Sequence, residues 1–218
     1  MKKLIIAISS AFVVFANSAM SMDLRPSIGI SGNSAVYAAT GIEENYNEAG
    51  TAVDTTSRVT GAFNESYISV FAEMSLNDVI SVGLDYVPIT IDTPENVSQE
   101  NEPNENKVYA SFEDLTTIYA KLNVPLGGTY LKVGYSTVNV NSKEVMGSGN
   151  NYGNDRSDAI VVGLGYAHEL ADGLAVRAEI TGSEFSDVTT TNGQTNKTEI
   201  KVEDMIGARG TISVVKSF

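Results

Sequence analysis

Apolar and polar residues alternate with a period of two along most of this chain, which is the pattern of β-strands rather than helices. In residues 66–76, for example, Ile68, Val70 and Ala72 are separated by Ser69 and Phe71. Eight such segments can be delimited: residues 27–41, 66–76, 79–89, 108–124, 129–140, 159–170, 174–184 and 200–218. The alternation slips near residues 137–138, and we expect a β-bulge there.

The connections between these segments alternate strictly between long and short. Residues 77–78, 125–128 and 171–173 are tight turns, whereas residues 42–65, 90–107, 141–158 and 185–199 are long, polar connections. An antiparallel up-and-down barrel with one short-turn rim and one long-loop rim produces this order, and transmembrane barrels are built in this way. The sequence therefore predicts an all-β fold, an eight-stranded antiparallel up-and-down transmembrane β-barrel, with both termini at the short-turn rim on the periplasmic side.

The polar face of the segments has the composition of a narrow barrel interior. It carries small residues such as Ser69, Gly83 and Gly165, which can sit beside large ones in the lumen of an eight-stranded barrel. It also carries charges of both signs, which we expect to form a polar network in the lumen: Glu73, Asp85, Lys121, Lys132, Arg177, Glu179 and Arg209. A regular hairpin places Lys121 opposite Lys132, so an acidic residue of this set should lie between them.

Alternation alone leaves a rival orientation open. A soluble, lipocalin-like carrier also alternates, but with its apolar face inside. Tyr86, Tyr166 and Phe218 lie near the ends of apolar phases, as in the aromatic girdles of membrane barrels. Asp114 and Asp204 interrupt the apolar phase near the long-loop ends of their segments, and we expect them above the membrane edge.

The N-terminus has the features of a secretory signal. Lys2 and Lys3 precede a short apolar stretch, and small residues follow it. We expect a signal peptide over residues 1–21, cleaved between Ala19 and Ser21 or just after, and a barrel domain over residues 22–218. Removal of the two lysines takes the formal net charge from −13 to −15, which argues against nucleic acid as a partner. The chain contains no cysteine, so no disulfide or thiolate metal site is available.

The C-terminal strand resembles a known targeting signal. Gly210, Ile212, Val214 and Phe218 match the C-terminal assembly signal of outer-membrane barrels, while Lys216 stands where an apolar residue is usual. With the signal peptide and the loop order, the mature chain is similar to the small-barrel group of OmpA membrane domains, OmpX and opacity-type proteins. The resemblance implies a bacterial outer-membrane location and recognition by the barrel-assembly machinery, and it implies little about activity.

The sequence predicts no catalytic, cofactor or metal site. The single histidine, His168, lies near a short turn without a converging nucleophile or carboxylate, and the carboxylates of Glu43 and Glu44 sit at a loop edge. The acidic loops, including residues 92–105, lack the ordered spacing of a calcium loop. Weak divalent-cation bridging to lipopolysaccharide phosphates is the softer expectation.

These observations predict a non-enzymatic, integral outer-membrane protein with a structural or surface-interaction role through its long acidic loops, embedded in outer-membrane lipid and lipopolysaccharide. Three alternatives remain open from sequence. They are a narrow channel for small or apolar solutes, a lipid-modifying barrel enzyme, and the secreted carrier.

Overall fold

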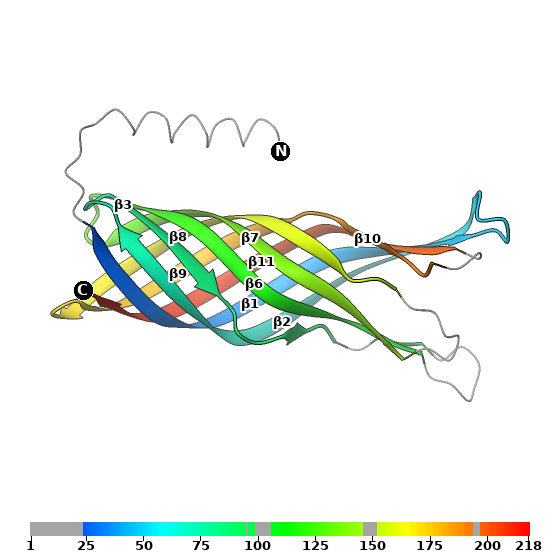
Figure 1. The fold of residues 1–218 in the computed structure, drawn as a ribbon, viewed down its shortest axis with the longest axis horizontal. Coiled ribbons are helices and arrows are strands. Elements are labelled where there is room, and N and C mark those ends of the chain that lie inside the picture. The colour runs from blue at the N-terminus through cyan, green and yellow to red at the C-terminus, as the bar shows by residue number, and fades with distance from the viewer. Residues whose placement is uncertain (1–23, 95, 99–105, 146–151, 194–196) are drawn as a thin grey trace, which may run out of the picture.

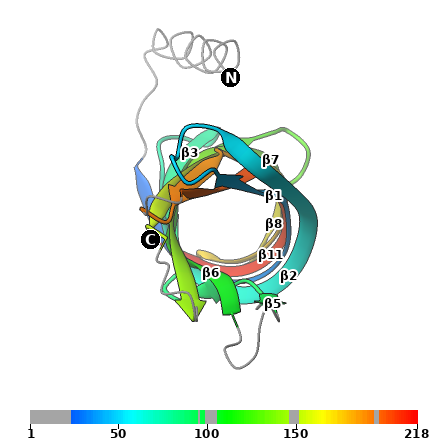
Figure 2. The same ribbon diagram turned by 90° about the vertical axis from the view of Figure 1, so that its right-hand side faces the viewer.

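Eight strands form a closed antiparallel ring in the computed structural model, which describes residues 24–94, 96–98, 106–145, 152–193 and 197–218. The ring consists of β1 (Arg25–Tyr46), β2 (Val53–Ser75), β3 (Ile80–Tyr86), β6 (Asn106–Asn123), β7 (Thr129–Val145), β8 (Asp155–Ala171), β9 (Leu174–Phe185) and β11 (Thr198–Ser217). Each pairs with its neighbour in sequence, and pairing of β1 with β11 closes the barrel, as the end view shows (Figure 2). The predicted fold class is confirmed.

Three short strands accompany the ring. β4 (Ile91–Asp92) and β5 (Asn96–Ser98) pair with β6, and β10 (Val188–Thr191) pairs with β11. The described part of the chain contains no helix that is long and apolar enough to cross a membrane.

The short turns gather at one rim, where both ends of the described chain also lie (Figure 1). The Asn77 side chain accepts hydrogen bonds from the backbone N–H groups of Val79 and Ile80, which is how an asparagine closes a tight turn. Gly127 and Gly173 adopt positive φ angles of 54° and 68° at the other two turns, conformations that glycine reaches without steric cost. The expected signal peptide lies outside the described residues.

At the long-loop end, two strands are much longer than a bilayer requires. β1 has 22 residues and β2 has 23, whereas about 9–11 tilted residues cross a bilayer. Their ends, residues 40–60, form a projecting hairpin (Figure 1). The loop expected over residues 42–65 is therefore wrong for most of its length. Both faces of this hairpin are polar, so no alternation marked it, although its run of Thr and Val favours strand.

Two bulges explain the acidic residues in the apolar phase. Asp114 and Asp204 have φ angles of 56° and 54°, and the register shifts beside each of them. Asp tolerates this left-handed conformation better than most residues. The bulge expected at residues 137–138 is thus misplaced, because β7 keeps its alternation there and the extra residue lies opposite, on β6.

The aliphatic rows face outward. Ile180 is 73% exposed and Ile118 62%, and the other exposed apolar residues form a belt around the ring that includes Ile28, Ile30, Ile68, Val70, Leu84, Leu131, Val162, Leu164, Ile206, Ile212 and Val214. The charged rows point into the centre. This orientation is that of a barrel surrounded by lipid and excludes the soluble carrier, whose aliphatic rows would meet inside.

Candidate functional site

The half of the lumen nearest the short turns is organised around one carboxylate. Glu73 on β2 is 1% exposed and binds Lys121 of β6 at 2.6 Å. Arg177 of β9 reaches across the barrel and donates two hydrogen bonds to the same carboxylate, at 2.8 and 3.0 Å. The Tyr119 hydroxyl donates a further bond at 3.1 Å. This two-pronged Arg–carboxylate geometry is the strongest form of the charged hydrogen bond, and here it ties opposite walls together.

A second pair lies beside the first. The register places Lys132 directly opposite Lys121, as the sequence predicted, and Lys132 binds Glu179 at 2.9 Å. The Tyr130 hydroxyl donates to the same carboxylate at 3.1 Å. The Lys132 ammonium also lies 4.2 Å from the centre of the Tyr119 ring, within the range of a cation–π contact. Each lysine therefore has its own carboxylate, which offsets the repulsion between the two cations.

Two glycines make room for the tyrosine rings. A Cβ at Gly165 would lie 2.2 Å from the Tyr130 ring, and one at Gly83 would lie 2.5 Å from the Tyr119 ring. Each ring therefore lies over the glycine that is paired with it on the neighbouring strand, where any larger residue would collide with the ring. The small residues noted in the sequence thus leave the space that the large side chains of the neighbouring strands occupy.

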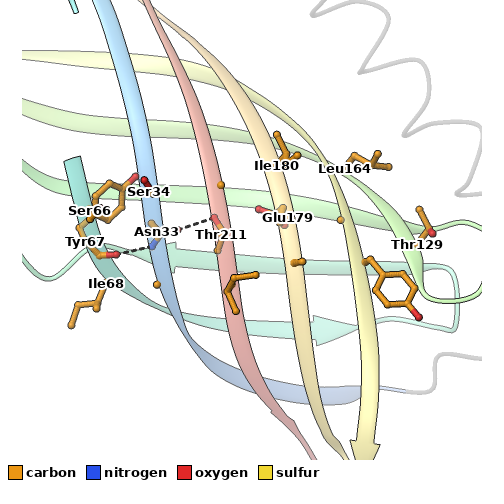
Figure 3. A pocket seen from close by; sticks show the side chains of 16 residues that line it. Asn33, Ser34, Ser66, Tyr67, Ile68, Thr129, Leu164, Glu179, Ile180 and Thr211 are labelled. Carbon is orange, nitrogen blue, oxygen red and sulfur yellow. Dashed lines mark hydrogen bonds between the residues drawn. The ribbon is translucent and has the colours of Figure 1, made fainter. Parts of the chain in front are cut away.

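A third group lies one layer further from the short turns. Arg209 approaches Asp85 at 3.8 Å, and Ser69 donates a hydrogen bond to Asp85 at 2.9 Å. Asn33 links three strands, because it donates to the Tyr67 backbone carbonyl and accepts a 2.8 Å bond from Thr211. Figure 3 shows Asn33 between these two partners. In the same view Ile180 and Leu164 extend from adjacent strands, and Ile68 extends from β2 on the other side of β1 and β11. All three are among the exposed outer residues.

This half of the lumen is filled. The cavity among the charged residues has a volume of about 20 Å³, which is room for about one water molecule. All seven residues expected in the lumen network line this cavity. Their ion pairs form three groups: Glu73 with Lys121 and Arg177, Glu179 with Lys132, and Asp85 with Arg209. The charged side chains of this layer pair with one another. In the described residues they leave no continuous path for water or ions through the layer.

The half of the lumen nearest the long loops is apolar, and the sequence did not indicate this. Its buried core contains Val87, Ile91, Leu115 and Val138. Aromatic side chains pack against that core: Tyr37, Phe63, Phe112 and Phe185. The cavity left among them is also about 20 Å³. The one signal in the sequence is Val138, an apolar residue on the inward-facing side of its strand, which in the sequence pattern looks like a phase slip.

The wall has a seam next to this apolar region. β3 ends at Tyr86, so only residues 70–75 of β2 have a partner on that side. Pro88 follows closely and cannot donate a backbone hydrogen bond, which ends the ladder. Above this point residues 53–69 of β2 pair with β1 on one side and with no described strand on the other side, which leaves an open edge. Phe63 and Phe112 stack across the seam, with ring centres 6.2 Å apart and planes 10° from parallel.

Ion pairs stiffen the projecting part of the wall. Lys201 of β11 binds Glu44 of β1 at 2.9 Å and Glu199 at 3.2 Å, and Lys197 binds Glu199 at 2.5 Å. The hydrogen bond from Lys197 holds the pKa of Glu199 below its usual value. The hydrogen bond to Glu44 raises the pKa of Lys201. Glu199 and Lys201 therefore remain charged at neutral pH, and the Lys201–Glu44 pair joins β11 to β1 beyond the belt.

The remaining residues of interest are dispersed. His168 is exposed on the outer face near the short-turn rim, opposite Val176. Ile212, Val214 and Phe218 also face outward, and Phe218 is 70% exposed. Within the described ranges no three acidic, histidine or cysteine side chains converge on a metal-sized site. Most of the acidic loop over residues 92–105 lies outside the described residues.

Comparison with known proteins agrees with this geometry. A family model described as "Outer membrane protein beta-barrel domain" matches residues 9–203. The chain belongs to this family of bacterial outer-membrane barrels. No curated protein sequence matches the chain.

Among solved structures, OprG from Pseudomonas aeruginosa is similar, with 12% identity, a TM-score of 0.51, and coverage of 88% of this chain and 95% of its own. AlkL is similar with 12% identity, a TM-score of 0.49, and coverage of 92% and 93%. The protease OmpT from Escherichia coli has 11% identity, a TM-score of 0.44, and coverage of 92% and 99%. These likenesses concern the fold.

Proposed function

We propose that this outer-membrane barrel acts at the cell surface, as a structural or adhesive protein whose contacts are made by the projecting hairpin and the long acidic loops. In this proposal the termini and the short-turn rim are periplasmic and the long-loop rim is outside the cell. The observation that carries it is the length of β1 and β2, which continue well beyond the apolar belt. A barrel that only had to cross the membrane would not need this wall.

The filled lumen supports the same proposal. A channel needs a continuous aqueous path, but the Glu73 network occupies the short-turn half. An enzyme needs a converging acid, base or nucleophile on an accessible face, and the only histidine lies on the outer face near the short turns. We therefore propose a non-enzymatic role.

The partners follow from the surroundings. We propose that acidic residues of the long-loop rim, such as Glu113, Asp155 and Asp187, bind lipopolysaccharide phosphates through bridging Mg²⁺ or Ca²⁺ ions. These hard cations bind the oxygen atoms of carboxylates and of phosphates alike. We also propose that Gly210, Ile212, Val214 and Phe218 are read by the barrel-assembly machinery, which is supported by their position on the last strand beside the β1–β11 closure.

The test uses cells that display the full chain or a trimmed chain in which a two-residue Asn-Gly turn joins Thr40 to Thr60, a pair that faces each other in the ladder. We expect the trimmed barrel to insert normally and to lose attachment of the cells to surfaces and to one another. Heat-modifiable gel mobility checks the insertion, and attachment under flow checks the role. Unchanged attachment of correctly inserted, trimmed cells would refute the proposal.

A second candidate function rests on a different observation. The apolar half of the lumen, with Phe63, Phe112 and Phe185, lies beside the seam. Its cavity of about 20 Å³ is closed by these rings, so a small hydrocarbon would enter from outside by parting the stacked Phe63 and Phe112. Its test is uptake of a radiolabelled alkane by cells with the native barrel or with Phe63→Lys. Faster uptake with the native barrel, lost in the variant, would favour this solute role.

A further inference from the structure

We infer that the free edge of β2 in the projecting hairpin pairs, antiparallel, with the same edge of a second copy displayed by a facing cell. This inference rests on the proposed surface role and names its partner. It starts from residues 53–69, whose side away from β1 pairs with no described strand.

The edge lacks two of the usual protections against pairing, proline and lysine. Natural edge strands are blunted by proline, by charged side chains and lysine above all, by β-bulges or by short length. Near its tip this edge carries two charges of opposite sign, Asp54 and Arg58, and a register shift beside Asp54. Residues 53–69 contain neither proline nor lysine, and residues 53–62 are all exposed. The stretch from Val53 to Thr60 is rich in β-branched residues, which favour the extended conformation. An open edge of this length is an unused template for one more strand.

Symmetry decides which copy can use this template. Two copies in one membrane are related by an axis along the membrane normal, so their tilted strands would cross rather than run side by side. Two copies in facing membranes are related by an axis in the plane between them, and this operation makes identical strands antiparallel. The contact is then self-complementary, with the same patch on both partners.

One alignment of the two β2 strands both pairs opposite charges and covers exposed apolar side chains. When Thr56 lies opposite Thr56 of the other copy, Asp54 lies opposite Arg58 twice, and Val53 lies opposite Val59 twice. Val59 is 68% exposed and Val53 is 45% exposed, so this pairing covers two apolar residues of each copy. Asp54 has no paired residue on β1, because Asn45 pairs with Thr55 and Tyr46 pairs with Val53.

Arg58 is available for this contact. Its present partner is Glu203 at 3.3 Å, and the two side chains are 59% and 35% exposed, which makes the pair weak. The guanidinium carries five N–H donors and can serve a second carboxylate. The register also confines the overlap to the hairpin tips, so the bodies of the two barrels stay apart.

Charge reversal tests the register in living cells. Cells that display Asp54→Arg or Arg58→Asp should lose aggregation when each population is alone, because both cross-pairs become repulsive. A mixture of the two populations should regain it, because both cross-pairs are again attractive. Settling of cell suspensions gives the measurement, and heat-modifiable mobility confirms equal amounts of folded barrel. No loss in the single populations, or no recovery in the mixture, would overturn the register.

A cross-link tests the contact directly. The chain has no cysteine, so Thr56→Cys introduces a single thiol. Opposed residues of antiparallel strands are about 4.5–5.5 Å apart between Cα atoms, within disulfide range. Two batches of purified full chain with different tags are placed in separate proteoliposomes, mixed and oxidised. We expect mixed-tag dimers with Thr56→Cys and few with Ala62→Cys, which lies on the same edge but outside the overlap.

The outcomes separate this inference from the proposed function. Equal yields at both cysteines, or dimers formed only within one liposome population, would overturn the pairing. If trimming the hairpin abolishes attachment while charge reversal has no effect, the surface role stands and the second copy is not the partner. If trimming has no effect, the proposed function itself fails.

Discussion

At the scale of single residues, Glu73 supports more of the interior than any neighbouring charge. It holds one lysine and one arginine from opposite walls, and both cations are largely buried. Removing one member of a buried ion pair leaves an uncompensated charge, which costs about 3–5 kcal/mol.

We therefore predict that Glu73→Gln lowers the free energy of unfolding by about 3–5 kcal/mol. Urea titration of the barrel in lipid vesicles, followed by heat-modifiable mobility, gives the measurement. The matched control is Glu48→Gln, an exposed carboxylate in the turn at the tip of the projecting hairpin, which should change the value by less than about 0.5 kcal/mol. Equal effects of the two variants would contradict the assignment.

Gly165 supplies a second residue-level prediction. A methyl group there collides with the Tyr130 ring, so Gly165→Ala should destabilise the barrel by about 1–3 kcal/mol, the usual cost of overpacking. Gly32→Ala is the control, because a Cβ at that position meets nothing within 4 Å. The same urea titration compares them, and a neutral Gly165→Ala would show that the ring can move aside.

At the scale of elements, the ion pairs between β1 and β11 should make the projecting hairpin sensitive to acid. A carboxyl whose pKa is lowered by folding stabilises the folded state above its unfolded pKa of about 4.3 and loses that contribution as the pH falls through the folded pKa. Glu199 is such a group. We predict that a spin label at the hairpin tip becomes more mobile below about pH 4. The transition should be absent in Glu199→Gln, whose label should be mobile at every pH.

Sequence periodicity located the strands that meet lipid on one side and the lumen on the other. There the two faces differ in polarity, as Ile68 and Ser69 illustrate, so alternation was visible. It failed for residues 42–65, because both faces of the hairpin are wetted and neither needs to be apolar. It also failed for the apolar half of the lumen, because Val138 and Phe185 break the contrast between the faces. The ion pairs of Glu73 join strands far apart in sequence, which no local pattern records.

At the scale of the whole molecule, the position of the apolar belt determines where charge is tolerated. Ile180 is 73% exposed within the belt, so Ile180→Arg should cost about 2–4 kcal/mol in a bilayer. Val59 is 68% exposed on the projecting hairpin, and Val59→Arg should cost almost nothing. Unfolding titrations in vesicles measure both. A similar cost at the two positions would mean that the belt does not mark the hydrocarbon.

The filled lumen gives a prediction for the same molecule. We expect the purified barrel to produce no discrete conductance steps in planar bilayers, because the described charged layer leaves room for about one water. Glu73→Ala combined with Arg177→Ala removes the central pair and should produce measurable openings. Reproducible steps with the native chain would contradict this.

The bulges at Asp114 and Asp204 have a consequence for how this chain can change over time. Strand faces have a strict parity, so gaining or losing one residue within the belt would turn every following side chain to the opposite face. A bulge absorbs such an extra residue and restarts the count. Insertions and deletions on the long-loop side of these two aspartates are therefore tolerable, whereas the same changes on the short-turn side would disrupt the fold. Length variation among descendants should collect on the long-loop side.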